Sequence, residues 1–364
     1  MKTNLCEVVL ERAPGKTPEG VRPGVTVKFG LDVHAAQITV CRQIDGLLPQ
    51  PPQKRSWAEC LEWIAAHVQA QAIVHSCYEA GPCGYGLHRQ LGALGVTNVV
   101  VAPQKWDAKQ RRVKTDRRDA RELCDRLDRY VRGNETVFSI VQVPTPEQEQ
   151  RRALTRQRST LVKERQRCVV RGHGLMLAQG VQAPEGWWQP KQWPALAAEL
   201  PEWLRASVNC WRERALGYDA QVQALTPAIE AQVAGLARPV GLGALTAALI
   251  EAEIMTWTRF QNRRQPGSFC GLCPSEDSSG TKRRQGAVTK AGNPRLRHVL
   301  VEAAWRIAHW QPDYPPLRLL RSAQGQRARK RMIVAVARRL LVDLWRLRTA
   351  RCTAEQLGLK MKQP

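Results

Sequence analysis

The sequence predicts an α/β domain, then a long helical segment, then an all-α C-terminal domain. In residues 25–145, apolar β-rich runs alternate with stretches of helical spacing, which is typical of a parallel sheet covered by helices. Residues 146–236 are highly charged and carry sparse apolar residues at helical spacing. Residues 237–350 contain further helical patterns with basic faces. We expect residues 1–24 to be a flexible extension and residues 351–364 to be a tail.

The elements of the first domain can be read in chain order. The sequence Val25–Val40 contains two β-rich runs, and Ser56–Gln69 has the spacing of an amphipathic helix. Ala72–Glu79 reads as a buried strand that ends at a Gly-Pro turn. A helix through Gly84–Leu94 and a short, wholly apolar strand at Asn98–Pro103 follow, as expected for a sheet buried on both faces.

Four carboxylates lie where this arrangement predicts the ends of elements. Asp32 closes the first strand and Glu79 closes a later one, while Thr115 can cap a helix whose first turns contain Asp116 and Asp119. Singly, each has an ordinary explanation in turn capping or in the helix dipole. Together they form an oxygen-rich set that suits Mg²⁺ or Mn²⁺, ions that assist phosphodiester chemistry.

The charge of the chain indicates a polyanionic partner. The 364 residues include 56 Lys and Arg against 32 Asp and Glu, a net charge of +24, and the isoelectric point is near 10.2. A surface this basic favours nucleic acid as the partner, DNA or RNA. No apolar run is long enough for a membrane span, and we expect a bacterial, cytoplasmic and nucleoid-associated protein that does not bind membranes.

The cysteines and histidines give no independent indication of a metal site. There are 11 cysteines, an odd number that favours reduced thiols. Cys270 and Cys273 form a lone C-x-x-C motif without the second pair that zinc requires. The seven histidines contain no H-x-x-x-H pair, so none is assigned to a metal.

A serine pair beside a basic cluster is the strongest candidate for a nucleophile. Ser278 and Ser279 precede Gly280, which permits positive φ and a sharp turn. A solvated basic loop is the alternative interpretation of this stretch. Several cations that could neutralise phosphates follow it or lie nearby: Lys282, Arg283, Arg284, Lys290, Arg295 and Arg297.

The middle of the chain predicts two antiparallel helices, at Glu147–Ala178 and Leu204–Leu236, after a boundary at Pro144–Pro146. The break between them carries three tryptophans, which we expect to form a small aromatic core rather than to stack on bases: Trp187, Trp188 and Trp193. Further on, a Gly-x-Gly turn that begins at Gly241 resembles a helix-hairpin-helix element, which can bind a phosphate at a helix N-terminus. Arg327–Leu347 predicts a basic helix.

The motifs, taken in order, resemble one family over residues 25–350. The strand of Asp32, the turn Tyr78-Glu79-Ala80-Gly81 and Lys114-Thr-Asp-Arg-Arg-Asp-Ala are similar to the DEDD, RuvC-like and hence RNase H-like domain of insertion-sequence-110 transposases and Piv-type DNA invertases. The stretch from Gly271 to Gly280, with Thr289-Lys-Ala-Gly-Asn, is similar to the C-terminal transposase domain of that family.

The resemblance implies a bridge-RNA-guided serine recombinase. It implies Mg²⁺ held by Asp32, Glu79, Asp116 and Asp119, and a nucleophile at Ser279, with Ser278 as the fallback. It further implies a coiled-coil linker that dimerises, a tetramer in the synaptic complex, and donor and target DNA as substrates.

Two other functions remain open from the sequence. The first is a metal-only nuclease of the RNase H or Holliday-junction-resolvase kind, in which water attacks and the serine only binds phosphate. The second is a non-enzymatic nucleic-acid-binding protein.

Overall fold

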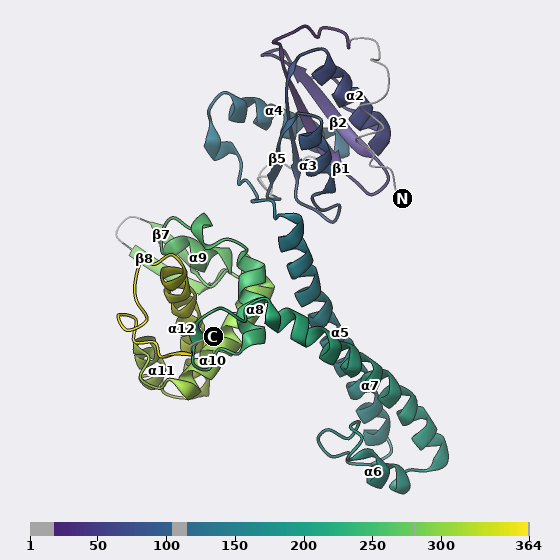
Figure 1. The fold of residues 1–364 in the computed structure, drawn as a ribbon, viewed down its shortest axis with the longest axis vertical. Helices are drawn as coiled ribbons and strands as arrows, with labels where there is room; N and C mark the ends of the chain where they lie inside the picture. The colour runs from purple at the N-terminus through teal and green to yellow at the C-terminus, as the bar shows by residue number, and fades with distance from the viewer. Residues whose placement is uncertain (1–17, 104–114, 280–281, 363–364) are drawn as a thin grey trace. The chain divides into compact units, whose positions relative to one another are not determined.

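The computed structural model describes residues 18–103, 115–279 and 282–362. The chain divides into two compact units, Met1–Val143 and Pro144–Pro364, shown in Figure 1. Each unit is described by itself. Most of the predicted N-terminal extension lies outside the described residues.

The first unit is an α/β domain built on a five-stranded mixed sheet with the order β3-β2-β1-β4-β5. β1 runs parallel to β4, and β4 to β5, while β2 is antiparallel to both of its neighbours. The predicted α/β class is therefore confirmed, although the sheet is not wholly parallel. Its strands are β1 (Thr26–Val33), β2 (Ile38–Ile44), β3 (Gln53–Arg55), β4 (Ile73–Glu79) and β5 (Thr97–Val101).

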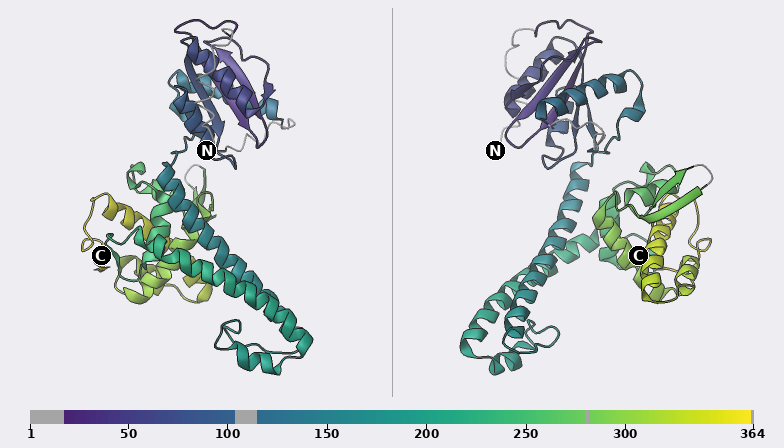
Figure 2. Two further views of the ribbon diagram at one scale, coloured as in Figure 1. Left: turned by 45° about the vertical axis from the view of Figure 1, so that its right-hand side comes forward. Right: turned by 180° about the vertical axis from the view of Figure 1, so that it is seen from behind.

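The two faces of the sheet pack against different helices, as Figure 2 shows. On β1, Phe29 and Leu31 belong to a core shared with α2 (Trp57–Gln69) and α3 (Gly86–Ala93). The intervening residues of β1 face the other way, toward α4 (Asp116–Val131). The strand β1 is thus buried on both sides, which explains its nearly continuous apolar sequence.

Glycine at position 30 allows α4 to lie directly on β1. A Cβ at Gly30 would lie 2.3 Å from the carbonyl oxygen of Ala120 and 2.4 Å from the amide nitrogen of Cys124. Farther along the same face, the Nζ of Lys28 donates a hydrogen bond of 2.7 Å to Oδ1 of Asp128, and both side chains are buried. These contacts fix the position of α4 on the sheet.

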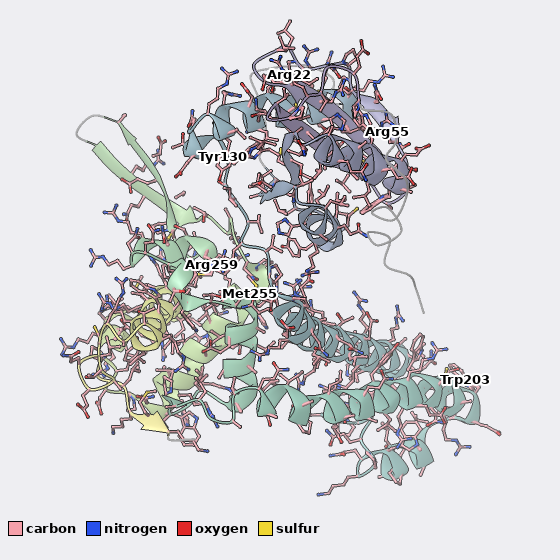
Figure 3. All side chains as sticks on the ribbon, turned by 45° about the horizontal axis from the view of Figure 1, so that its top comes forward. Arg22, Arg55, Tyr130, Trp203, Met255 and Arg259 are labelled. Atoms are coloured by element: carbon pink, nitrogen blue, oxygen red, sulfur yellow. The ribbon has the colours of Figure 1, made fainter. Side chains whose placement is uncertain are left out.

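The second unit begins with a helical hairpin, which follows the sequence prediction. α5 (Pro146–Leu177) and α7 (Glu202–Ala231) pack along each other, and the short helix α6 (Trp193–Glu199) lies in the connection. Trp187 is 2% exposed and packs in an apolar cluster with residues of both long helices. The aromatic core predicted there is confirmed. Trp203, at the start of α7, is exposed (Figure 3).

The rest of the second unit packs around three helices that share one core. They are α8 (Ala244–Ile254), α10 (Pro294–Trp310) and α12 (Gln326–Arg348). Smaller elements join them: η2 (Trp257–Arg259), α9 (Arg264–Phe269), η3 (Pro315–Leu317), α11 (Arg318–Arg321), and the paired β6 (Arg238–Pro239) and β9 (Met361–Lys362).

The prediction that this region is all-α was wrong. Pro274–Ser279 (β7) and Lys282–Val288 (β8) form an antiparallel hairpin, with Asp277 opposite Arg284. Both strands are largely polar, so they lack the apolar alternation that indicates a strand in sequence. The expected turn at Gly280 lies outside the described residues.

Among the helices in the described parts of the chain, none combines the length and the apolar character needed to cross a membrane.

Candidate metal site and serine hairpin

The residues of the first candidate site come from the carboxyl end of β1 and the amino end of α4. Asp32 lies on the face of β1 that contacts α4, two residues after Gly30. Asp116 is the first residue of α4, and the hydroxyl of Thr115 caps that helix by accepting from the amide of Arg118 at 3.4 Å. The N-cap predicted from sequence is confirmed, and it fixes the end of the helix that carries Asp116.

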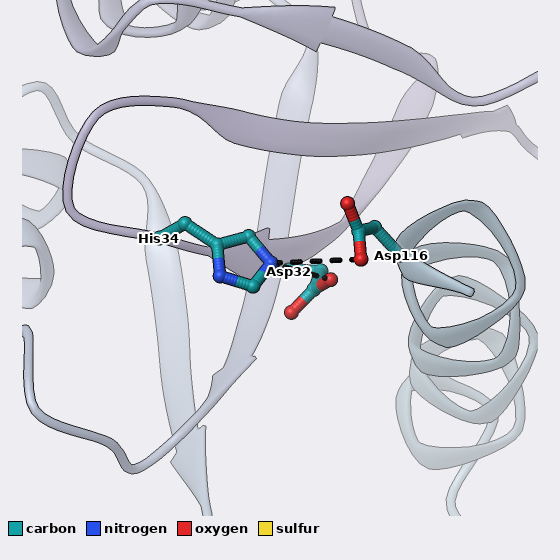
Figure 4. A group of neighbouring side chains, drawn as sticks. All are labelled: Asp32, His34 and Asp116. Atoms are coloured by element: carbon teal, nitrogen blue, oxygen red, sulfur yellow. Dashed lines mark hydrogen bonds and ion pairs between the residues drawn. The ribbon is translucent and has the colours of Figure 1, made fainter. Parts of the chain in front are cut away.

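Asp32, His34 and Asp116 come together at this point (Figure 4). One potential ligand atom from each lies within 4.8 Å of the others. The Nε2 of His34 is 3.2 Å from Oδ2 of Asp32 and 3.8 Å from Oδ1 of Asp116. The Nζ of Lys54, on β3, lies 3.3 Å from Oδ2 of Asp116. Both carboxylates therefore have a positively charged or protonatable neighbour.

The pKa values of the two carboxylates, Asp32 and Asp116, are shifted in opposite directions. Burial raises the pKa of Asp32, and the nearby charges of Asp119 and Asp116 raise it further, against the opposing effect of His34. The hydrogen bond and charge of Lys54 lower the pKa of Asp116. Asp32 is thus a half-buried carboxylate close to other negative charges. A bound cation would offset the repulsion between them.

The remaining two predicted carboxylates lie on the same side of the sheet. Leu31 of β1 is paired with Tyr78 of β4, so the next residues, Asp32 and Glu79, lie at the same level of adjacent parallel strands. Asp119 is one turn beyond Asp116 on α4 and acts on the pKa of Asp32. Within the described residues, the three-residue group contains neither of them.

The chemistry of this donor set fits a divalent cation. Two carboxylates and an imidazole suit Mn²⁺ or Mg²⁺, with the nitrogen favouring a transition metal such as Mn²⁺. The Nε2 of His34 is the atom near both carboxylates, so a cation bound there would take the place of its contact with Asp32.

The second candidate site is on the β7–β8 hairpin. Ser278 and Ser279 are the last residues of β7 and pair with Arg283 and Lys282 of β8. The side chain of Ser279 is exposed, as is that of Arg284. The sequence interpretation placed both serines on a turn, whereas they end a strand.

Of the basic residues that follow the hairpin, two are exposed and one is hydrogen-bonded within the fold. Lys290, in a left-handed conformation with φ of 55°, and Arg295, at the start of α10, are exposed. Arg297 is engaged within the fold, because its Nη1 donates to the carbonyl oxygens of Cys270 at 2.9 Å and of Lys290 at 3.1 Å. Arg297 therefore holds the turn that connects the hairpin to α10.

Sequence reasoning missed several residues in or beside the candidate metal site. His34 carries no metal-binding motif, but it directly follows β1 and lies two residues after Asp32, a spacing that could have been used as a signal. Lys54 approaches Asp116 only through the pairing of β2 with β3. Gly30 matters only because α4 crosses it, which local sequence does not specify.

Comparison with known proteins places these features in context. A sequence model with the description "Transposase IS116/IS110/IS902 family" matches residues 235–316, which include α8, the serine hairpin and α10.

Several curated proteins are similar over most of the chain. A putative transposase, y4rJ, of Sinorhizobium fredii is 34% identical over 79% of this chain and 79% of its own length. The transposase for insertion sequence element IS1111A of Coxiella burnetii is 26% identical over 75% of this chain and 78% of its own length. The transposase for element IS1533 of Leptospira borgpetersenii is 25% identical over 77% and 85%, respectively.

Proposed function

Because the chain belongs to the IS116/IS110/IS902 family of transposases, we propose that it catalyses cation-dependent cleavage and exchange of DNA strands for an insertion sequence. The observation that carries this proposal is the convergence of Asp32 and Asp116, with His34, where the end of β1 meets the start of α4. The α/β unit that holds this group is assigned on the same grounds to the RuvC-like, RNase H-like class.

The proposed roles of the first unit follow from its charges. Asp32, Asp116 and His34 would hold the divalent cation, with Glu79 and Asp119 completing the acidic surroundings. When bound, Mg²⁺ or Mn²⁺ polarises a phosphoryl oxygen and stabilises a departing oxygen. Gly30 and the Lys28–Asp128 ion pair keep α4 in place, so that Asp116 remains beside Asp32. The raised pKa of Asp32 supports this role: burial is its main cause and the charges of Asp119 and Asp116 add to it, so a bound cation would stabilise the ionised carboxylate.

In the second unit, we assign the role of nucleophile to Ser279, and Ser278 is the alternative candidate. Attack of the Ser279 oxygen on a DNA phosphorus would form a serine–phosphate ester and release the 3′ oxygen of the DNA; the ester keeps the energy of the broken bond for rejoining. The serine proton leaves with a base or with water. The exposure of Ser279 and its backbone pairing with Lys282 of β8 support this assignment.

The partners of the protein are proposed on the same basis. We infer donor and target DNA as substrates, a bridge RNA as the guide, and a dimer formed by the α5–α7 hairpin as a coiled coil, which assembles into a tetramer at synapsis. The Gly241–Gly243 turn, where Gly241 has φ of 89° before α8, is consistent with a helix-hairpin-helix contact to backbone phosphate.

The test begins with expression of the gene together with its flanking noncoding DNA. RNA that copurifies with the protein is sequenced, and Mg²⁺-dependent strand joining is compared between the wild type and Ser279→Ala, with Ser278→Ala as the matched control. A discrete RNA from the flank and joining that is lost only in Ser279→Ala support the proposal. Cleavage that persists in Ser279→Ala and in Ser278→Ala would indicate a metal-only nuclease instead.

A further inference from the structure

A cavity of about 430 Å³ lies within the second unit, and its lining includes no residue of the serine hairpin. The acidic group formed by Asp32, His34 and Asp116 belongs to the first unit. Its walls come from α5, α8 and α10. On α5 it is lined by Arg156, Ser159 and Lys163, and on α10 by Arg295 and His298. Leu249 and Val299 add apolar surface. Two helices far apart in sequence thus bring cations to one concave surface.

The single carboxylate in the lining, Glu253 of α8, already has hydrogen-bond and ion-pair partners within the protein. Glu253 is 2% exposed. Arg156 donates to both of its oxygens at 3.0 Å, and the Nδ2 of Asn293 donates to Oε2 at 2.7 Å. Arg152 adds a further charge at 3.7 Å. Burial alone would raise the pKa of Glu253, but these contacts outweigh burial and lower it. Glu253 therefore stays ionised and holds the three helices together.

The outer cations of the cavity have no such partner. Lys163 and Arg295 are exposed, and among the described residues neither lies within salt-bridge distance of a carboxylate. Since the charge of Glu253 is neutralised by Arg156 and Arg152, the opening of the cavity has a net positive charge. Two unpaired cations in the lining of one cavity form a surface that attracts an anion.

We propose that this cavity binds a backbone phosphate of the nucleic acid on which the protein acts, through Lys163 of α5 and Arg295 of α10. The hydroxyl of Ser159 and the imidazole of His298 add hydrogen-bonding groups to the same lining, and Leu249 and Val299 can pack against the adjoining sugar. The inference rests on the proposed action on nucleic acid, but it does not depend on the acidic group or on the serine.

A phosphodiester fits these features better than an isolated small anion. Lys163 and Arg295 at the cavity are exposed, so a phosphate that belongs to a longer chain can reach them from solvent. Lys and Arg contacts to phosphates release condensed counterions, which makes such binding dependent on salt. DNA and RNA carry the same phosphate, so the experiment includes both polymers.

The test measures binding of the full-length protein to a DNA duplex and to a single-stranded RNA by fluorescence anisotropy over a range of salt concentrations. For Lys163→Ala/Arg295→Ala, we expect binding to weaken by about tenfold. The slope of log K against log salt should become shallower by about one unit for each lost contact. The matched control is Lys191→Ala/Arg205→Ala, which removes two exposed cations at the α6 end of the hairpin.

The outcomes are decisive in each direction. A shallower slope in the cavity variant and an unchanged slope in the control support the proposal, and the polymer that shows it identifies the source of the phosphate. An unchanged slope with both polymers, in a variant with the unfolding temperature of the wild type, would overturn it. Asp32→Asn separates this result from the proposed function, because it should abolish strand cleavage while leaving both salt slopes unchanged.

Discussion

At the scale of single residues, Gly30 determines whether the acidic group can form. Its missing Cβ leaves room for the backbone of α4, which carries Asp116 to Asp32. We expect Gly30→Ala to lower the free energy of unfolding of the first unit by about 1–3 kcal/mol, because α4 must move outward. It should also weaken Mn²⁺ binding, which isothermal titration calorimetry measures.

A control for this substitution lies in the same unit. A Cβ added at Gly92, near the end of α3, would meet no atom within 4 Å outside its own helix, and Gly92 does not adopt positive φ. Gly92→Ala should therefore leave Mn²⁺ affinity unchanged and stabilise α3 by about 0.5–1 kcal/mol. Equal Mn²⁺ affinity of Gly30→Ala and Gly92→Ala would contradict the role assigned to Gly30.

Glu253 should make the stability of the second unit dependent on pH. Its pKa is lowered in the folded state, so it contributes stability above the pKa of the unfolded chain, and this contribution is lost as the pH falls through the lower, folded value. We expect Glu253→Gln to cost about 3 kcal/mol at pH 7, since it leaves Arg156 and Arg152 without their partner. Urea unfolding at pH 7 and at about pH 3.5 should show a smaller difference between wild type and variant at the lower pH. A difference independent of pH would refute this account.

Sequence alone could identify the individual carboxylates but not their neighbours. Asp32 and Glu79 end apolar runs, and Asp116 follows an N-cap residue, so local patterns reveal them. His34 is the exception, because it lies two residues after Asp32 and this spacing is a local signal. Lys54 contributes through strand pairing, and Glu253 through the packing of α8 against α5 and α10. Contacts of this kind depend on tertiary structure and leave no local pattern.

At the scale of elements, the α5–α7 hairpin depends on the apolar cluster near α6. Leu204 and Met176 are fully buried there. We expect Leu204→Ala to destabilise this end of the hairpin by about 2–5 kcal/mol, seen as faster amide hydrogen exchange in α6 and the adjoining turns of α7. Leu177→Ala, at a side chain that is 58% exposed, is the control and should change exchange little. Unchanged exchange in Leu204→Ala would show that the cluster does not hold this end together.

The elements that could be predicted from the sequence are those with a regular apolar pattern. The long helices and the buried strands have strong apolar patterns, and the sequence predicted them within a few residues. The β7–β8 hairpin was missed because its strands are polar and its pairing places acidic residues opposite basic or polar ones, as at Asp277 and Arg284. A polar hairpin of this kind has no apolar alternation, so hydrophobic periodicity does not reveal it.

At the scale of the whole molecule, the division into two units predicts that a bound cation stabilises only the unit that binds it. The acidic group lies in Met1–Val143 and shares no residue with the second unit. In differential scanning calorimetry, Mn²⁺ at about 100 times its dissociation constant should stabilise the first unit by about 2.7 kcal/mol, and the transition of the second unit should stay in place. A shift of the second transition alone would place the cation elsewhere.

The central claim is that the acidic group is the catalytic centre for DNA strand cleavage. The most direct measurement is the rate of strand cleavage against Mg²⁺ or Mn²⁺ concentration for the wild type, Asp32→Asn and Glu135→Gln, an exposed carboxylate of the same unit. We expect Asp32→Asn to lose about 100-fold or more in rate and Glu135→Gln to retain the wild-type rate. Cleavage by Asp32→Asn at the wild-type rate, with the same cation dependence, would contradict the account.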